Sequence, residues 1–293
     1  STRGWSYGSS VVDPRTGEIL KRHVTLGCLR VRQDLLIARG MTSPFTQDDD
    51  DGEGSEAVDD REALEMALAR IRQLSAHEVG HTLGLAHNFA ASVRDRASVM
   101  DYPHPLMELD DGGGVSLAGA YATGIGAWDK RAIRYGYTQF GDPADEGPGL
   151  ARLLESNRDG GFEFISDPDS RQMSDFHPRS HLWDNGTDPL AELERVMRLR
   201  AAALARFGER SIPVGSPLSD LQEAIVPVYL YHRYQVEAVA KLVGGVDYRY
   251  ALRGDSEGPA ATVVDASRQR AAVDALLDTL DPGTLSLSPE LLV

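Results

Sequence analysis

Two short runs with strand-like composition occupy the start of the chain, and a turn separates them. Val11 and Val12 end the first run, and the sequence DPRTGE follows at 13–18 with Asp, Pro and Gly, which turns favour. The second run, ILKRHVTLGCLRV, covers residues 19–31. This pattern predicts a β-hairpin.

The spacing of the apolar residues becomes helical after about residue 59. Leu64, Leu68 and Ile71 recur at helical intervals, and the same character continues through SAHEVGHTLG, residues 75–84. Gly84 suits the left-handed position that ends a helix. We therefore expect one long helix that ends near Gly84.

A stretch punctuated by glycine and proline, residues 89–124, is predicted to be mostly loop. Helical patterns dominate after it, over 125–137, 188–207, 217–243 and 265–280. The second of these begins with Asp188 as N-cap and Pro189 in the first turn, and the third is expected to kink at Pro227. The sequence contains no internal repeat and no long linker, so we expect the C-terminal helices to pack on the preceding part.

Charge and composition restrict the classes of function. The 293 residues carry a formal net charge of -15, and this acid excess argues against a nucleic-acid partner, which needs clustered Lys and Arg. No apolar run approaches the roughly 20 residues that a transmembrane helix requires. Cys28 is the only cysteine, so a metal site in this chain must use histidine or carboxylate ligands.

Acidic residues are concentrated in residues 46–60, TQDDDDGEGSEAVDD, which contain no basic residue. We interpret this segment as a solvated loop, and a calcium site built from its carboxylates is the alternative. A second polar group, Asp184, Asn185 and Asp188, precedes a predicted helix. Its pattern favours a turn with an N-cap over a calcium site.

The residues that carry chemistry lie at the end of the long predicted helix, in HEVGH at 77–81. Positions i and i+4 of an α-helix are about 40° apart and about 6 Å apart along the axis, so the imidazoles of His77 and His81 reach one metal ion. Glu78 is rotated by about 100° from His77. Its carboxylate is therefore expected beside the metal, where it can accept a proton from water.

A third histidine, His87, follows His81 by six residues. In a continuous helix it would lie about 240° away from His81, but a positive φ at Gly84 lets the chain turn back and makes His87 a third ligand. Three histidines with a fourth position left for water are the ligand set of a catalytic zinc site. The arrangement predicts hydrolysis of an amide or ester with Glu78 as general base.

The sequence HEVGHTLGLAHN, residues 77–88, followed by SVMDYP, residues 98–103, resembles the metzincin zinc peptidases, whose pattern is HExxHxxGxxH with a downstream Met-turn. The resemblance implies that His77, His81 and His87 bind zinc, that Glu78 is the base and that Met100 is the Met-turn residue beneath the site. With DPRTGEIL, IGAWDKRAIRYGY and HLWDNGTDPLAELERVM, these motifs are similar to the bacterial Met-zincin group of zinc peptidases.

Tyr102 follows Met100 by two residues, at the place where some metzincins carry a tyrosine that stabilises the tetrahedral intermediate. The resemblance makes Tyr102 a candidate catalytic residue, and a packing tyrosine whose hydroxyl bonds to the backbone is an equally open interpretation. His23 and His104 are expected to be strand or surface histidines, because the set of three ligands is complete without them.

The resemblance implies an α+β, metzincin-like fold with a small twisted sheet, a zinc-binding active-site helix, a Met-turn and a mostly helical C-terminal part. We place an N-terminal catalytic subdomain at 1–89, ending in the zinc helix, and a C-terminal subdomain at 90–293. A metzincin usually has a sheet of about five strands before the zinc helix, but only 76 residues precede His77. Either this sheet is smaller here or some of its strands lie upstream of Ser1.

The predicted function is that of a zinc-dependent peptidase with one catalytic Zn²⁺ and a peptide or protein substrate. In such a peptidase an extended substrate pairs with an edge strand, for which residues 19–26 are the candidate. Two alternatives stay open, a zinc hydrolase of non-peptide amides or esters and a non-catalytic zinc-containing binding protein. Glu78 argues against the second, because a structural zinc needs no base. The resemblance also implies an extracytoplasmic bacterial protein, periplasmic or secreted, and the sequence does not predict an oligomeric state.

Overall fold

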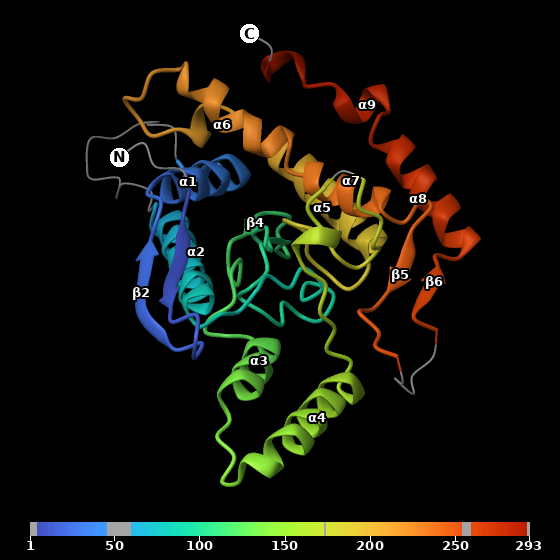
Figure 1. Ribbon diagram of the computed structural model, residues 1–293. Coiled ribbons are helices and arrows are strands. Elements are labelled where there is room, and N and C mark those ends of the chain that lie inside the picture. The colour runs from blue at the N-terminus through green and yellow to red at the C-terminus, as the bar shows by residue number, and fades with distance from the viewer. Residues whose placement is uncertain (1–4, 46–59, 173, 254–258, 292–293) are drawn as a thin grey trace.

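The computed structural model describes residues 5–45, 60–172, 174–253 and 259–291. Helix α2 (Arg61–Thr82) lies between a β-hairpin and the loops of the middle of the chain, and helix α1 (Leu29–Thr42) packs against it (Figure 1). The C-terminal helices form the opposite side of the molecule (Figure 1). Helices therefore dominate, and the expected α+β fold is confirmed with sheets that are small.

Each sheet among the described residues consists of two antiparallel strands. The pairs are β1 (Tyr7–Val12) with β2 (Ile19–Thr25), β3 (Glu108–Leu109) with β4 (Val115–Ser116), and β5 (Val246–Tyr248) with β6 (Ala261–Val263). The predicted hairpin is thus present, and Gly17 in its turn has a φ of 76°. The expected second strand was too long, because the chain leaves β2 at Thr25 and begins α1 at Leu29.

The long helix expected before Gly84 is confirmed as α2. The middle of the chain is mostly loop, as predicted, and leads to α3 (Ala127–Tyr137), which pairs with α4 (Pro143–Asp159). The sequence analysis did not predict α4. The two helices extend from the lower part of the molecule in Figure 1, and Tyr137 Oη connects them to α2 by donating to the carbonyl of Leu83 at 2.8 Å.

The C-terminal half contains α5 (Pro189–Leu204), α6 (Asp220–Tyr229), α7 (Arg233–Ala240), α8 (Ala266–Asp278) and α9 (Pro282–Leu285). The short 3₁₀ helices are η1 (Asp167–Asp169), η2 (Glu209–Ser211) and η3 (Pro289–Leu291). The single helix expected over 217–243 with a kink at Pro227 is wrong. Pro227 lies inside α6, and the helix breaks after it at 230–232, where Tyr231 turns inward and donates to the carbonyl of Pro105 at 2.7 Å.

Two groups of buried apolar side chains hold these elements together. The larger group joins α1, α2, α5 and α6 to the middle loops through residues such as Met41, Met66, Met107, Leu199 and Val228. The smaller group joins α5, α7 and α8. The C-terminal helices therefore pack on α1, as the lack of a linker predicted, and α1 in turn supports α2.

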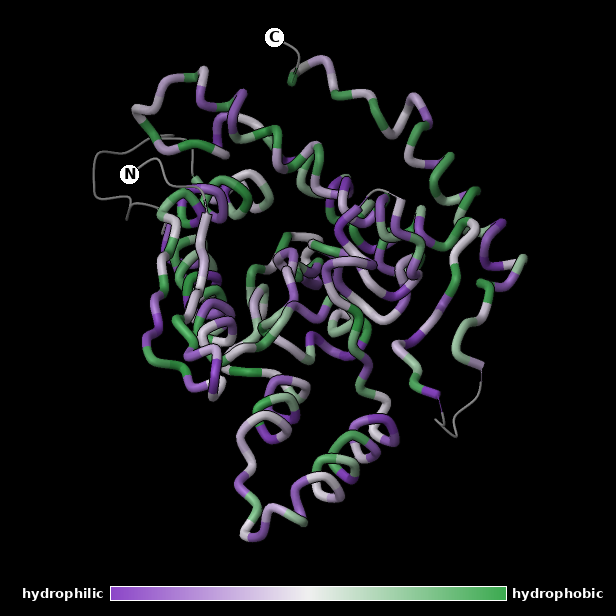
Figure 2. The backbone as a smooth tube through the Cα atoms, in the orientation of Figure 1, coloured by the Kyte–Doolittle hydropathy of each residue, from purple (hydrophilic) through white to green (hydrophobic). Residues whose placement is uncertain are grey.

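Hydrophobic and hydrophilic residues are interspersed along the helices (Figure 2). Within the described ranges, no helix combines the length and the apolar character needed to cross a membrane.

Candidate metal centre

Three histidine side chains converge at the C-terminal end of α2. The Nε2 atom of His81 lies 3.1 Å from Nε2 of His77 and 3.1 Å from Nε2 of His87. Nitrogens that bind one zinc ion tetrahedrally at 2.0–2.1 Å are roughly 3.3 Å apart. In the part of the chain that the structure describes, this is the one group of three or more His, Cys, Asp or Glu side chains close enough to hold a metal ion.

Local backbone geometry produces this convergence. His77 and His81 are one turn apart on α2, and the helix ends in a Schellman motif, in which Gly84 N–H donates to His81 O at 3.0 Å and Leu85 N–H donates to Gly80 O at 3.1 Å. Gly84 has a φ of 85°. A side chain at residue 84 would meet no atom within 4 Å, so glycine is favoured there for its conformation and not for its size.

The other ring nitrogen of each histidine has a separate partner. Nδ1 of His77 lies 2.6 Å from Val99 O, Nδ1 of His81 lies 2.9 Å from Leu85 O, and Nδ1 of His87 lies 2.8 Å from a carboxylate oxygen of Asp167. These acceptors place the ring proton on Nδ1. The lone pairs of all three Nε2 atoms are then directed at the shared centre, as metal binding requires.

Burial keeps the imidazoles of His77 and His87 neutral. Burial lowers the pKa of His77 to about 3, against the opposing effect of its hydrogen bond to Val99. Burial also lowers the pKa of His87, although Asp167 acts in the opposite direction. Neutral imidazole is the form that binds a metal, so the donor set, its spacing and its protonation all fit zinc.

Glu78 is buried on α2 beside the first ligand, where the strand β1 packs on the helix. Its Oε2 atom has no hydrogen-bond partner among the described residues. Burial raises the pKa of Glu78, and a hydrogen bond from the backbone of Gly8 partly offsets this effect. Gly8 comes so close that a Cβ atom there would overlap the backbone oxygen of Glu78. The hairpin therefore positions the α2 backbone at Glu78.

Met100 lies beneath the same turn of α2. Its side chain is fully buried, and a Cβ atom at Gly80 would overlap its Sδ atom. Glycine at position 80 of HEVGH thus has a steric explanation, because only a residue without a side chain leaves room for the methionine under the two helical histidines. Asp129 on α3 holds the segment before Met100 by accepting hydrogen bonds from Ser98 Oγ and from Val99 N–H.

Tyr102 packs directly on the ligands. Its ring centroid lies 4.9 Å from that of His87 and 5.4 Å from that of His77. The hydroxyl accepts a hydrogen bond from Arg171 Nη2 at 2.8 Å, and Arg171 also pairs with Asp167, the partner of His87. The hydroxyl of Tyr102 therefore bonds to a side chain, whereas a tyrosine with a packing role alone is expected to bond to the backbone.

Sequence reasoning did not find Asp167 or Arg171. Asp167 lies 80 residues after the ligand that it contacts. Both residues belong to or follow the turn η1, which carries no motif of its own. The two carry opposite charges at i and i+4, a spacing that signals a local pair but not a contact with His87.

The remaining candidates lie elsewhere. His23 is an exposed residue of β2, as expected. His104 lies in a loop, half-buried against a small cavity, so it is neither a strand nor an exposed histidine, and, as expected, it is not one of the three clustered histidines. Asp188 caps α5 by accepting from Leu190 N–H at 2.9 Å, which confirms the N-cap. The acidic segment 46–60 lies outside the described residues except for Asp60, which pairs with Arg39. Calcium is not supported.

A large groove begins where α2 ends. It has a volume of about 1200 Å³ and is lined by the β1–β2 hairpin, by residues 83–86, by α3 and α4, and by residues 248–250 and 252. Most of this lining is apolar. The groove therefore adjoins the turn between His81 and His87, and its walls are mainly apolar.

Comparison with known proteins gives one match. A family model described as Met-zincin matches residues 59–293, a range that includes the three histidines, Glu78, Met100, Tyr102 and Asp167 but not the hairpin or α1. Searches of curated proteins and of solved structures found no match.

Proposed function

Because the chain belongs to the Met-zincin family, we propose that it is a zinc-dependent metallopeptidase in which His77, His81 and His87 hold the metal and Glu78 is the general base. The observation that carries this proposal is the meeting of three Nε2 atoms beside a buried carboxylate that keeps one oxygen free. A bound zinc ion supplies Lewis-acid chemistry there, since it polarises a carbonyl group and makes water a stronger acid.

Glu78 has the properties that a general base needs. Its free Oε2 atom can accept the proton of a water molecule, and its raised pKa makes the carboxylate a better proton acceptor than an exposed one. Water then adds to the substrate carbonyl, and the same carboxyl group returns the proton to the leaving amine. A purely structural zinc site has no use for this free oxygen, which disfavours the non-catalytic alternative.

Tyr102 is suited to the negative charge that develops on the substrate carbonyl oxygen. Its hydroxyl oxygen accepts from Arg171, so its own proton is free to be donated. Met100 is the residue expected for the Met-turn, and its place under Gly80 supports that role. For the substrate we propose an extended peptide in the apolar groove beside residues 83–86, with β2 as the candidate edge strand.

The test of this function is the variant Glu78→Gln, assayed with a panel of quenched fluorescent peptides and with ester substrates. The substitution removes the base and leaves the ligands, so zinc content should stay at one per chain while turnover falls by about 10²- to 10⁴-fold. Glu65→Gln is the matched control, because Glu65 is an exposed residue of the same helix. Near wild-type turnover by zinc-loaded Glu78→Gln would reject the role of Glu78, and hydrolysis of esters without peptides would favour the non-peptide hydrolase.

A further inference from the structure

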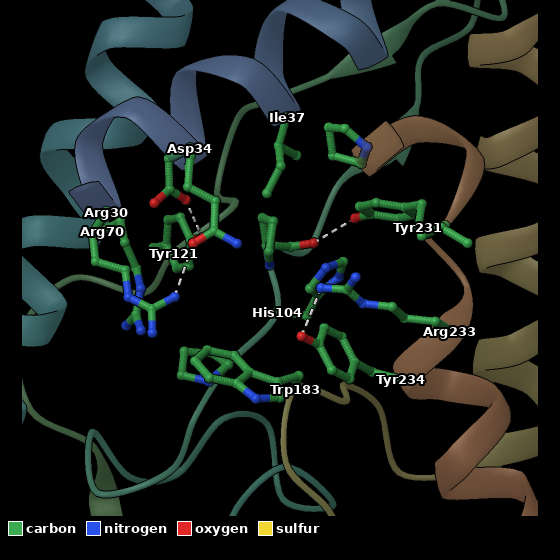
Figure 3. A pocket seen from close by; sticks show the side chains of 15 residues that line it. Arg30, Asp34, Ile37, Arg70, His104, Tyr121, Trp183, Tyr231, Arg233 and Tyr234 are labelled. Atoms are coloured by element: carbon green, nitrogen blue, oxygen red, sulfur yellow. Dashed lines mark hydrogen bonds between the residues drawn. The ribbon is translucent and has the colours of Figure 1, made fainter. Parts of the chain in front are cut away.

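A small, partly open cavity lies behind Tyr102. It has a volume of about 60 Å³, and Trp183, whose ring is centred 5.0 Å from that of Tyr102, forms part of its wall. Figure 3 shows Arg30 and Arg70 on one side of this cavity and Arg233 on the other. The cavity is large enough for a small group such as a carboxylate, and it is separated from the zinc ligands by two aromatic rings.

The cavity is strongly basic for a chain with a net charge of -15. Arg70 is buried and Arg30 is half-buried, and their guanidinium groups lie 5.9 Å and 5.3 Å from the centre of the Trp183 ring. Each donates to a neighbouring glutamine, Arg30 to Gln33 and Arg70 to Gln73. A guanidinium has five N–H donors, so both keep donors for another partner.

The residues that line the cavity carry more positive than negative charge, because Arg30, Arg70 and Arg233 face a single carboxylate. Asp34 is the one carboxylate among the lining residues, and its Oδ1 accepts from Tyr121 Oη at 2.6 Å. Burial lowers the pKa of His104 to about 3, so this ring carries no charge. Burial and then repulsion from Arg70 lower the pKa of Arg30, whereas Asp34 acts in the opposite direction. Burial raises the pKa of Asp34, and the smaller, opposite effects of Arg70 and Arg30 in turn lower it.

Two segments connect this cavity to the candidate metal centre. Arg70 precedes His77 by seven residues on α2, so the two lie on nearly the same face of the helix, about 10 Å apart along its axis. The chain also runs from Tyr102, which packs on the ligands, to Pro103, His104 and Pro105, which line the cavity. A distance of about 10 Å corresponds to roughly three residues of an extended peptide.

We propose that this cavity binds a carboxylate group of the peptide substrate, located about three residues from the cleaved bond. The inference rests on the proposed peptidase function. The carboxylate is either the C-terminus of the peptide or the side chain of Asp or Glu, and Arg30 and Arg70 are its recognition residues. Their planar N–H donors match the two oxygens of a carboxylate.

Binding measurements on zinc-loaded Glu78→Gln, in which cutting should be slower by at least about 10²-fold, test this inference. The probes are alanine hexapeptides blocked at both ends that carry Glu or Gln at each position in turn, and one alanine hexapeptide with a free or an amidated C-terminus. Recognition predicts that one acidic peptide binds 10- to 100-fold more tightly than its neutral counterpart, as expected for hydrogen bonds to a charged group. The position of the preferred Glu, or a preference for the free C-terminus, identifies the source of the carboxylate.

The variant Arg30→Met should abolish this preference and leave the affinity for the neutral peptide unchanged. Arg32→Met is the matched control, since Arg32 lies on the same helix but pairs with Glu223 at the surface. Arg30→Lys, which keeps the charge without the planar donors, should retain part of the preference and shows that the cavity remains intact.

Equal affinity for every acidic and neutral pair overturns the inference, and so does a preference that survives in Arg30→Met. These outcomes are independent of peptidase activity, because they compare binding affinities and not rates of turnover. Tight acidic binding by a protein whose wild type hydrolyses no peptide would support the carboxylate site and reject the peptidase assignment.

Discussion

Each imidazole at the candidate metal centre is oriented by an acceptor on a different part of the chain. Val99 O and Leu85 O are backbone atoms, whose positions the adjoining turns determine. Asp167 is the exception, because it is a side chain that also pairs with Arg171. A charged acceptor fixes the tautomer of His87 and makes its Nε2 a stronger donor to the metal.

The variant Asp167→Asn should therefore bind zinc 10- to 100-fold more weakly than the wild type, the usual cost of losing such a partner. Competition with a chelator of known zinc affinity measures the change. Asp169→Asn is the control, since Asp169 belongs to the same 3₁₀ turn but accepts from Tyr248 and Tyr250. Wild-type zinc affinity in Asp167→Asn would show that the carboxylate does not support His87.

The hydroxyl of Tyr102 can act either in catalysis or in packing, and the two roles predict different effects of its removal. If it donates to the substrate oxyanion only after the oxyanion has formed, Tyr102→Phe should lower kcat by on the order of 10²-fold, or about 3 kcal/mol, with KM and zinc content little changed. Tyr229→Phe removes a hydroxyl that bonds to Leu285 O far from the site, and it should change stability alone. Unchanged kcat with a lower melting temperature in Tyr102→Phe would assign this hydroxyl to structure.

At the scale of elements, α2 determines the site through its two contact faces. On one face, Gly8 of β1 packs against the backbone of α2 at Glu78. On another face, the side chain of Met100 packs against Gly80. Both contacts require glycine for steric reasons. Helix α2 is thus held between the hairpin and the turn at 99–100, and the imidazoles project from a segment that is packed closely on two sides.

The variant Gly80→Ala should lower the free energy of unfolding by about 1–3 kcal/mol, because its methyl group overlaps Met100 Sδ in a packed interior. Urea denaturation measures this loss. The double variant with Gly80→Ala and Met100→Ala should lose less free energy of unfolding than the sum of the losses in the two single variants, since the smaller side chain at position 100 leaves room for the methyl group. Gly136→Ala in α3, where a Cβ meets no atom within 4 Å, should be neutral or slightly stabilising. Additive costs for Gly80 and Met100 would exclude a steric contact between them.

Local signals explain which elements could be predicted from the sequence. The hairpin turn, the apolar periodicity of α2 and the N-cap of α5 are each visible in a short stretch of sequence. Helix α1 has no such signal, because no side chain caps its N-terminus and no acidic residue lies in its first turn. Asp142 caps the N-terminus of α4, but Gly147, Pro148 and Gly149 inside the helix are residues that normally indicate a loop, so the sequence does not predict a helix there. The break after α6 depends on the burial of Tyr231, a tertiary contact that no local pattern reports.

The site divides in the same way. His77, Glu78, His81 and His87 lie within eleven residues, so helix geometry and one glycine suffice to predict their meeting. Asp167, Arg171 and the basic cavity are assembled from segments far apart in the chain. Their contacts follow from the packing of the whole molecule, which the residue pattern does not encode locally.

At the scale of the whole molecule, the centre lies where three segments far apart in the sequence meet, and hydrogen bonds such as Phe89 N–H to Ile165 O also join them. His77 and His81 belong to α2, and His87 is hydrogen-bonded to Asp167 in the turn η1. Arg171 pairs with Asp167 and donates a hydrogen bond to Tyr102. The apolar core lies mainly on the other side of α2, among α1, α5 and α6. A metal ion held by the three histidines would therefore add a link between α2 and η1 that lies outside this larger group of apolar side chains.

Zinc should accordingly stabilise the folded protein by an amount that depends on its free concentration. A ligand that binds only the folded state adds about 4 kcal/mol at 1,000 times its Kd, which in a protein of this size raises the melting temperature on the order of 5–10 °C. Thermal unfolding in buffers of defined free zinc concentration measures the slope, with a chelated sample as the reference. His81→Ala is the control, because it removes the nitrogen that lies 3.1 Å from both other ligands, and its melting temperature should not respond to zinc. If the wild-type melting temperature were the same in zinc and in chelator, zinc would not bind the folded state preferentially, and the three histidines would not form the metal centre proposed for them.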